Sequence, residues 1–275
     1  MKQNILKRYY KDKTIVIVGA AGGIGHELSL LCSRYTDKLV LIGRNVAKLQ
    51  TLSNKISGSH FFLADITNAT EVNNTLDTIE KDVGPVDISF NLAAVDYFIR
   101  FDHMTPDEIT ESCRINFEGT ILYTQALLKK MMKRNSGTIV NAVSFSNGSV
   151  AFPFFAVDSA TRAGLSNLFR SLRKELRKTH PGIRFTLFSP PPTKTETELS
   201  RGSSKVWGKL GVNMHEPNEV ASNIFLKTAQ GKDEIMGAAE KALRLVDTLS
   251  TKISQLIFFN KYQKISSQFL DKNKS

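Results

Sequence analysis

The residues best suited to chemistry form a glycine-rich loop near the start of the chain. A β-branched run, Thr14–Val18, leads directly into the segment Gly-Ala-Ala-Gly-Gly-Ile-Gly at 19–25. Glycines let a backbone approach a phosphate closely, and a helix that begins there offers unpaired N–H groups and a positive dipole end. A tight turn without a ligand is the alternative. Its place after the first strand of a βαβ pattern favours a dinucleotide site with these residues: Gly19, Ala21, Gly23, Ile24 and Gly25.

Two polar residues after later strands bear on which dinucleotide is bound. Arg44 follows the apolar run 39–42, at a point where a carboxylate would bind the ribose 2′-hydroxyl. A guanidinium there suits a 2′-phosphate, so the sequence favours NADP(H) over NAD(H); a solvated surface arginine is the alternative. Asp65 follows the third apolar run and is expected to bind the adenine amino group or to cap the next helix.

These residues need a scaffold in which strands and helices alternate. Apolar runs predict strands at 14–18, 39–42, 60–63, 86–90, 138–143 and 183–188. Helical patterns follow at 23–34, 47–56, 70–82, 107–132, 159–178 and 217–230. Fully apolar strands joined by helical crossovers predict an α/β fold, a doubly wound parallel sheet of the Rossmann type in a single domain.

The domain is expected to occupy residues 1–236 and to include a mobile, substrate-side segment at 193–215. Residues 237–275 are expected to form a basic C-terminal extension with apolar positions at helical spacing. From residue 241 onward it holds seven Lys/Arg and two Asp/Glu. This composition fits an amphipathic helix on an anionic membrane surface, and equally a helix packed against the domain or a second subunit.

Composition excludes several other classes. The chain has 275 residues, 41% of them apolar, and 37 Lys/Arg against 26 Asp/Glu give a charge of +11. It can bury a sizeable core, and no nucleic-acid recognition module is found. Cys32 and Cys113 have neither disulfide nor zinc spacing, so no metal is expected and a cytoplasmic setting is favoured, with peripheral membrane contact left open. No run of about 18 apolar residues offers a spanning helix.

Taken in order, several motifs resemble the short-chain dehydrogenase/reductase family over roughly 13–230. The matching segments are Val-Gly-Ala-Ala-Gly-Gly-Ile-Gly at 18–25, Asp65, Gly-Pro-Val-Asp at 84–87, Asn-Leu-Ala-Ala at 91–94, Asn116 with Gly119-Thr120, and the stretch from Gly137 to Ser144. The resemblance implies an oxidoreductase fold, a homo-oligomer and a nicotinamide dinucleotide. It adds further cofactor contacts at Ile66, Asn91, Ala93, Arg162, Pro190 and Thr193.

The resemblance also implies a reaction site, from which this chain departs. Family members use a tyrosine to exchange the carbonyl proton, a lysine to lower its pKa, a serine and an asparagine. Ser144 and Asn116 match the last two. Alignment on Ala-Gly-Leu at 163–165 puts Asp158 at the tyrosine position and Arg162 at the lysine position, and the chain has no tyrosine between residues 123 and 262.

This replacement affects reduction more than cofactor binding. Asp158 and Arg162 are four residues apart at a helix start, and pairing with a guanidinium predicts an ionised carboxylate. Such a group cannot donate a proton, although it can act as a base, while Arg162 can still donate to a ribose. The sequence predicts an NADP(H)-binding protein impaired for ordinary carbonyl reduction, a pseudoenzyme. The alternative is an active carbonyl reductase that uses Ser144 with a non-standard proton donor such as Tyr97 or His103.

Two further segments bear on the reaction site. The apolar stretch Val150–Val157 predicts either a pocket wall for a hydrophobic small molecule or simple packing between helices. Pro191 stands where the family has a glycine, which removes a backbone donor near the nicotinamide, and Thr193 remains available for that contact.

Overall fold

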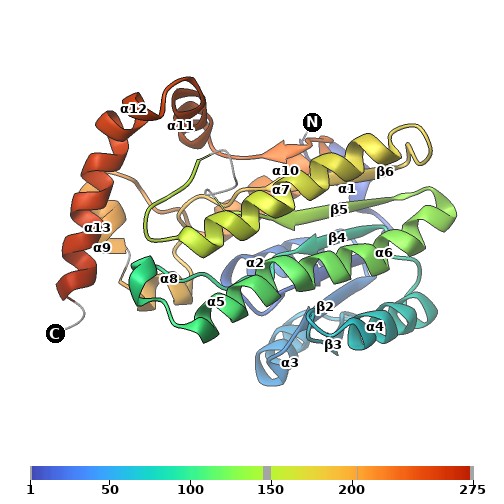
Figure 1. Cartoon of the computed structure of the whole chain (residues 1–275). Helices are drawn as coiled ribbons and strands as arrows, with labels where there is room; N and C mark the ends of the chain where they lie inside the picture. The colour runs from blue at the N-terminus through green and yellow to red at the C-terminus, as the bar shows by residue number, and fades with distance from the viewer. Residues whose placement is uncertain (1, 145–149, 203, 273–275) are drawn as a thin grey trace.

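The computed structural model describes residues 2–144, 150–202 and 204–272, and within them seven parallel strands form one sheet in the order β3-β2-β1-β4-β5-β6-β7 (Figure 1). The strands are β1 Ile15–Val18, β2 Leu39–Gly43, β3 His60–Leu63, β4 Ile88–Asn91, β5 Gly137–Ala142, β6 Ile183–Phe188 and β7 Glu234–Ile235. The order reverses between β1 and β4, and a crevice at such a switch point is where ligands bind in open α/β sheets. The predicted doubly wound α/β fold is confirmed.

Helices cover both faces of the sheet because its strands are apolar on both sides. In β1, Val16 and Val18 face one core and Ile15 and Ile17 face the other, as strand alternation requires. The first core is covered by α4 Ala69–Asp82, α6 Thr120–Arg134 and α7 Ala156–Leu176. The second is covered by α1 Lys2–Tyr10, α2 Gly23–Cys32, α3 Val46–Lys55 and α10 Pro217–Ala229.

Helix α1 and the two-residue strand β7 were not predicted from the sequence. The charged segment of α1 is held by its two tyrosines. The Tyr9 hydroxyl shares a hydrogen bond with the Thr138 hydroxyl at 3.0 Å, and Tyr10 stacks on Phe225 with ring centroids 3.7 Å apart and donates a hydrogen bond to its carbonyl at 2.7 Å. Strand β7 is recognisable only through its pairing with β6. Both depend on partners far away in the sequence.

The single helix predicted over 107–132 is wrong in one respect, since it is interrupted. Helix α5 Pro106–Cys113 passes through a π-helical turn, η2 Arg114–Gly119, into α6. The turn carries Asn116, whose side chain bonds to both backbone groups of Val95. Local π turns are frequent at functional sites, and here the turn directs an amide toward the carboxyl edge of the sheet.

The C-terminal third is more ordered than the sequence suggested. The segment predicted to be mobile at 193–215 contains two short helices, α8 Glu196–Ser200 and α9 Ser204–Leu210. The extension forms α11 Ala238–Leu249, α12 Thr251–Ser254, a π turn η3 Gln255–Phe259 and α13 Asn260–Lys272, which confirms its helical spacing. Of the two expected placements, packing on the domain is realised by α13, which lies beside α9 (Figure 1). None of the helices described here has the length and apolar character needed to cross a bilayer.

Candidate active site

Two adjoining hollows run along the carboxyl edge of the sheet and share the residues of the β1–α2 and β4 loops. The shared residues are Gly19, Gly22, Leu92 and Ala94. The hollow toward β2, here the adenosine end, is also lined by Arg44, Asp65, Ile66 and Ala93. The hollow toward β6, here the reaction end, is lined by Ser144, Arg162 and the segment from Pro190 to Thr193. An elongated ligand would span both.

Two glycines of the loop, Gly19 and Gly25, have no room for a side chain. Gly19 has a φ of +78°, and a Cβ there would lie 2.9 Å from the backbone nitrogen of Ala93. At Gly25 a Cβ would lie 2.2 Å from the Gly19 carbonyl oxygen. This close packing brings the start of α2, with its unpaired N–H groups, to the shared part of the hollows. The cradle therefore fits the phosphates of a dinucleotide. Within the loop, Ile24 lines the reaction end, and the Ala21 side chain lines a separate hollow.

The adenosine end combines one basic and one acidic side chain. Arg44 is exposed at the end of β2, and its charge acts on Asp65. Burial would raise the pKa of Asp65, but hydrogen bonds from Thr67 and the positive charges of Arg44 and Arg114 hold it below its ordinary value. Asp65 does not cap α4, since that position belongs to Asn68; its Oδ1 instead accepts from the Thr67 backbone and hydroxyl, both at 2.8 Å.

Asn91 braces the sheet beneath the shared part of the cavity. Its amide nitrogen donates to Asn141 Oδ1 at 3.0 Å and to Thr120 Oγ1 at 3.3 Å, while its oxygen accepts from the Ala93 backbone at 3.2 Å. One buried side chain thus links β4 to β5, α6 and its own loop. Asn91 lines neither hollow, so the cofactor contact expected of it stays a prediction.

At the reaction end, Asp158 and Arg162 form a buried ion pair in the first turns of α7. Arg162 Nε lies 3.1 Å from Asp158 Oδ1, and its Nη1 donates to the Ala142 carbonyl at 3.2 Å. Both residues are almost fully buried, with 4% and 3% of their surface exposed. Ser144 donates to the Asp158 carboxylate, and the Asn116 amide lies 3.5 Å from it. The four predicted catalytic residues therefore come together.

The expected direction of the Asp158 pKa shift needs correction. Pairing with Arg162 predicts a lowered pKa, but burial raises the pKa of Asp158 by more than Arg162 and the Ser144 hydrogen bond lower it. The carboxyl is removed from water on all sides, and the loss of hydration penalises its charged form. Asp158 is therefore easier to protonate than its partner alone would suggest.

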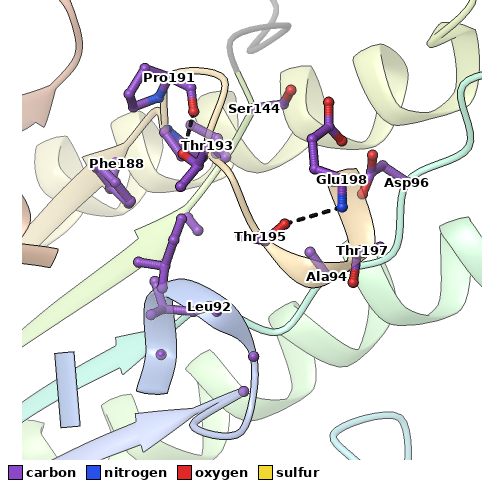
Figure 2. Close-up of a pocket in the computed structure, with 18 of the residues that line it drawn as sticks. Leu92, Ala94, Asp96, Ser144, Phe188, Pro191, Thr193, Thr195, Thr197 and Glu198 are labelled. Atoms are coloured by element: carbon purple, nitrogen blue, oxygen red, sulfur yellow. Dashed lines mark hydrogen bonds between the residues drawn. The ribbon is translucent and has the colours of Figure 1, made fainter. Parts of the chain in front are cut away.

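The segment after β6 closes the reaction end from the other side. Figure 2 shows Pro191 and Thr193 on one wall and Asp96 and Glu198 on the other. The Thr193 hydroxyl donates to the Pro191 carbonyl at 2.6 Å, so this threonine is engaged within its own turn. A Cβ at Gly23 would lie 2.7 Å from the Thr195 methyl, which shows how closely this segment covers the glycine loop.

Asp96, Thr195 and Glu198 line the reaction end and were missed by sequence reasoning. Thr195 accepts a hydrogen bond from the Glu198 backbone at 3.2 Å and so caps α8. The Thr-x-x-Glu spacing at 195–198 was the available signal for a helix start. Asp96 had no such signal, because it is placed by the loop after β4 and by an ion pair with Arg201.

The two alternative proton donors lie away from this cluster. The Tyr97 hydroxyl donates to Glu111, and that bond is the largest of the effects that raise the pKa of Tyr97 to about 12. His103 lies in the short turn η1 Phe101–His103 with its Nε2 3.6 Å from Asp102. Neither side chain lines the reaction end.

The apolar stretch 150–157 contributes both to the cavity wall and to packing, while a hydrophobic ligand at that wall stays a prediction. Phe155 lines the reaction end, whereas Val150, Phe152 and Phe155 also pack with Trp207 and Tyr262 in a third hydrophobic cluster. Packing is the larger part.

Comparisons with known proteins agree with this architecture. Residues 13–205 match the family described as short chain dehydrogenase. This chain belongs to the short-chain dehydrogenase family. An uncharacterised oxidoreductase of Staphylococcus aureus strain USA300 is 33% identical over 223 residues, which cover 80% of this chain and 93% of that protein. Members of the family bind a nicotinamide dinucleotide.

Solved structures share the fold at lower identity. A short chain dehydrogenase from Bacillus anthracis has a TM-score of 0.74 at 21% identity and covers 83% of this chain and 95% of its own. A variant of actinorhodin polyketide ketoreductase with NADPH has a TM-score of 0.73 at 20% identity, covering 82% and 96%. Across the described ranges of this short-chain dehydrogenase, no three His, Cys, Asp or Glu side chains gather as metal ligands would.

Proposed function

We propose that this short-chain dehydrogenase binds NADP(H) and is impaired for ordinary carbonyl reduction. The observation that carries the proposal is the buried Asp158–Arg162 pair, which stands where the family has a tyrosine and a lysine. A phenol in that position donates a proton to the developing alkoxide. Here a short carboxyl is tied to a guanidinium, a serine and an asparagine, and no tyrosine lines the cavity.

Cofactor binding rests mainly on groups outside the Asp158–Arg162 pair, to which Arg162 adds one donor. Gly19 and Gly25 keep the backbone of the loop close to the pyrophosphate, and the start of α2 supplies N–H donors. Arg44 would pair with a 2′-phosphate, and Arg162 would donate to the ribose next to the nicotinamide. The nicotinamide, when bound, supplies or accepts a hydride. Ser144 would then orient a carbonyl oxygen at the reaction end.

The deciding experiment is an NADPH titration followed by a screen of carbonyl substrates. The chain as it exists is expected to bind NADPH without measurable turnover, and the double variant Asp158→Tyr/Arg162→Lys is expected to gain turnover. Robust ketone reduction by the unmodified chain would refute the impairment. A lack of NADPH binding would refute the proposal as a whole.

A second candidate follows from the burial of Asp158, which raises the pKa of its carboxyl. If a reduction occurs, Asp158 itself is the proton donor, with Ser144 in contact and Asn116 beside it. Asp158→Asn would then abolish turnover while NADPH binding persists. Tyr97→Phe is the matched control and is expected to have no effect, because Tyr97 is engaged with Glu111.

Two finer features complete the proposal. Leu92, Phe155 and Phe188 on the cavity wall suit a hydrophobic small molecule at the reaction end. A homo-oligomer through the long helices α6 and α7 follows the family resemblance. Displacement of a fluorescent apolar probe tests the binding of a hydrophobic molecule. Sedimentation of the purified chain tests the homo-oligomer.

A further inference from the structure

The extension exposes five large apolar side chains on two adjoining helices. We define the tail stripe as Leu245, Leu249, Ile253, Leu256 and Ile257, which are between 52% and 77% exposed. Leu245 and Leu249 are one helical turn apart on α11, and the other three are three or four residues apart, or adjacent, on α12 and η3. The chain is extended at Ser250 between the two helices, which contact each other. In Figure 1, α11 and α12 lie at the upper left, away from the strands. These five are half of the ten exposed large apolar residues found among the described positions.

The tail stripe is carried by a segment that is fixed to the domain on both sides. Upstream, Arg244 donates to Glu234 of β7 at 3.0 Å. Downstream, Phe259 and Tyr262 are buried, and the Tyr262 hydroxyl donates to the Pro153 carbonyl at 3.3 Å. The chain could have buried the apolar residues between these anchors by the same helical packing. Instead it presents them to the outside in a defined orientation.

The exposed charges around the tail stripe have one sign. Over residues 241–264 the exposed charged side chains are Lys241, Lys252, Lys261 and Lys264. The one carboxylate in that range, Asp247, is half-buried and accepts a hydrogen bond from the Ser254 hydroxyl. The whole chain carries +11. An apolar stripe bordered by lysines is the pattern of helices that lie in the interface of a bilayer with anionic lipids.

We propose that the tail stripe docks on an anionic lipid surface, with its leucines and isoleucines in the interfacial region and the four lysines among the headgroups. The uniform positive charge selects this occupant over a second copy of the chain. Two copies meeting through their stripes would bring eight exposed lysines together with no exposed carboxylate of the same range to neutralise them.

Docking would also orient the cavity, a consequence that rests on the proposed function. Phe258 follows the tail stripe directly, and its ring centroid lies 5.9 Å from Phe152 and 5.8 Å from Tyr262. Phe155, in the same cluster, lines the reaction end. A lipid surface under the stripe would therefore lie close to the apolar wall of the cavity, where a hydrophobic ligand would enter.

The test is co-sedimentation of the full chain with vesicles of phosphatidylcholine and phosphatidylglycerol, compared with phosphatidylcholine alone. The unmodified chain is expected to pellet with the mixed vesicles, less so at high salt and least with neutral vesicles. Leu249→Ser/Ile253→Ser/Leu256→Ser is expected to lower the partition coefficient by about tenfold or more. A control, Val46→Ser/Leu63→Ser/Phe101→Ser, removes three apolar groups that are 49–63% exposed elsewhere on the chain and should pellet like the parent.

Three outcomes would overturn the proposal. The unmodified chain could stay in the supernatant with anionic vesicles, or the stripe variant could pellet as well as its parent. Alternatively, sedimentation velocity could show a dimer that the stripe variant converts into monomers, which would make the stripe a contact between copies. NADPH affinity and thermal unfolding are measured for each variant. Thermal unfolding shows whether a variant is folded, and NADPH affinity tests the proposed function. Failure of lipid docking can therefore be told apart from misfolding and from failure of cofactor binding.

Discussion

The glycine loop and the reaction end of the cavity are built from different kinds of group. In the loop, which contributes to both hollows, contacts come from backbone held close by glycines, as at Gly19 and Gly25. At the reaction end they come from side chains that bond to one another, foremost Asp158 with Arg162. Gly19 and Gly25 of the loop accept no larger residue without a steric clash. At the reaction end, an aspartate and an arginine stand where the family resemblance implies a tyrosine and a lysine.

Under the proposed function, this difference would account for a chain that binds the cofactor without reducing carbonyls. A backbone cradle depends on conformation, so it persists for as long as the fold does. A proton donor depends on one functional group and its pKa, and one substitution removes it. Four predictions would break or sharpen this comparison.

The largest effect is expected at the buried ion pair. Asp158→Asn leaves the Arg162 guanidinium buried without its counter-charge, and arginine cannot lose its proton, so the free energy of unfolding should fall by about 3–5 kcal/mol. Arg162→Gln should cost less, about 1–2 kcal/mol, because the buried carboxyl can take up a proton instead. Urea denaturation of both variants measures the asymmetry. Equal costs would show that the pair is not desolvated as described.

The glycine cradle should respond nearly as strongly. Gly25→Ala places a methyl group against the Gly19 carbonyl, and about 3 kcal/mol of stability should be lost together with NADPH binding. Gly208→Ala is the matched control, since a Cβ there meets nothing within 4 Å and alanine is the better helix former by up to about 1 kcal/mol. Calorimetric unfolding measures the stability of both variants, and NADPH titration measures their cofactor binding. Normal binding by the Gly25 variant would contradict the backbone argument.

A third prediction concerns Glu240, which bonds to Ser189 directly before the proline segment of the reaction end. Burial raises the pKa of Glu240 to about 7 from an ordinary 4.5, and the charge of Glu234 adds to this shift. Hydrogen bonds from Ser189 and the Gly237 backbone and the charge of Arg244 lower the pKa, but by less than burial raises it. The unfolded chain therefore loses this proton first. Stability should fall as the pH rises from about 4.5 to about 7 and then level off, by about 2 kcal/mol after allowance for partial exposure.

Glu240→Gln should remove that fall. The measurement is the difference between the urea-unfolding free energies of parent and variant at several pH values, which cancels the other titrating groups. A difference that does not change with pH over this range would exclude a raised pKa at Glu240.

The smallest effect is expected at the adenosine end, where a side chain rather than backbone is proposed to select the cofactor. Arg44→Asp should weaken NADPH binding on the order of 30-fold and leave NADH binding nearly unchanged, because only NADPH carries the 2′-phosphate. Arg8→Asp makes the same change of net charge on exposed α1 and should alter neither. An equal loss of affinity for NADPH and NADH in the Arg44 variant would contradict a role of Arg44 in selecting NADPH.

Much of the fold could be predicted from the sequence because the signals were local. Apolar runs and glycines gave the first six strands and the loop at 19–25 nearly to the residue. The π turn at Asn116 could not be predicted, since it forms around bonds to Val95, 21 residues earlier. The same holds for α1, whose Tyr10 packs on Phe225.

The candidate site divides in the same way. The residue types at positions 116, 144, 158 and 162, and the absence of a tyrosine at the reaction site, were determined by the sequence alone. The degree to which Asp158 is buried, and with it the direction of its pKa shift, was decided only by the tertiary structure. The sequence determines which ionisable residues are present. The energy of a charge depends on how much water is removed from it, and that is set by chain segments that meet only when the protein folds.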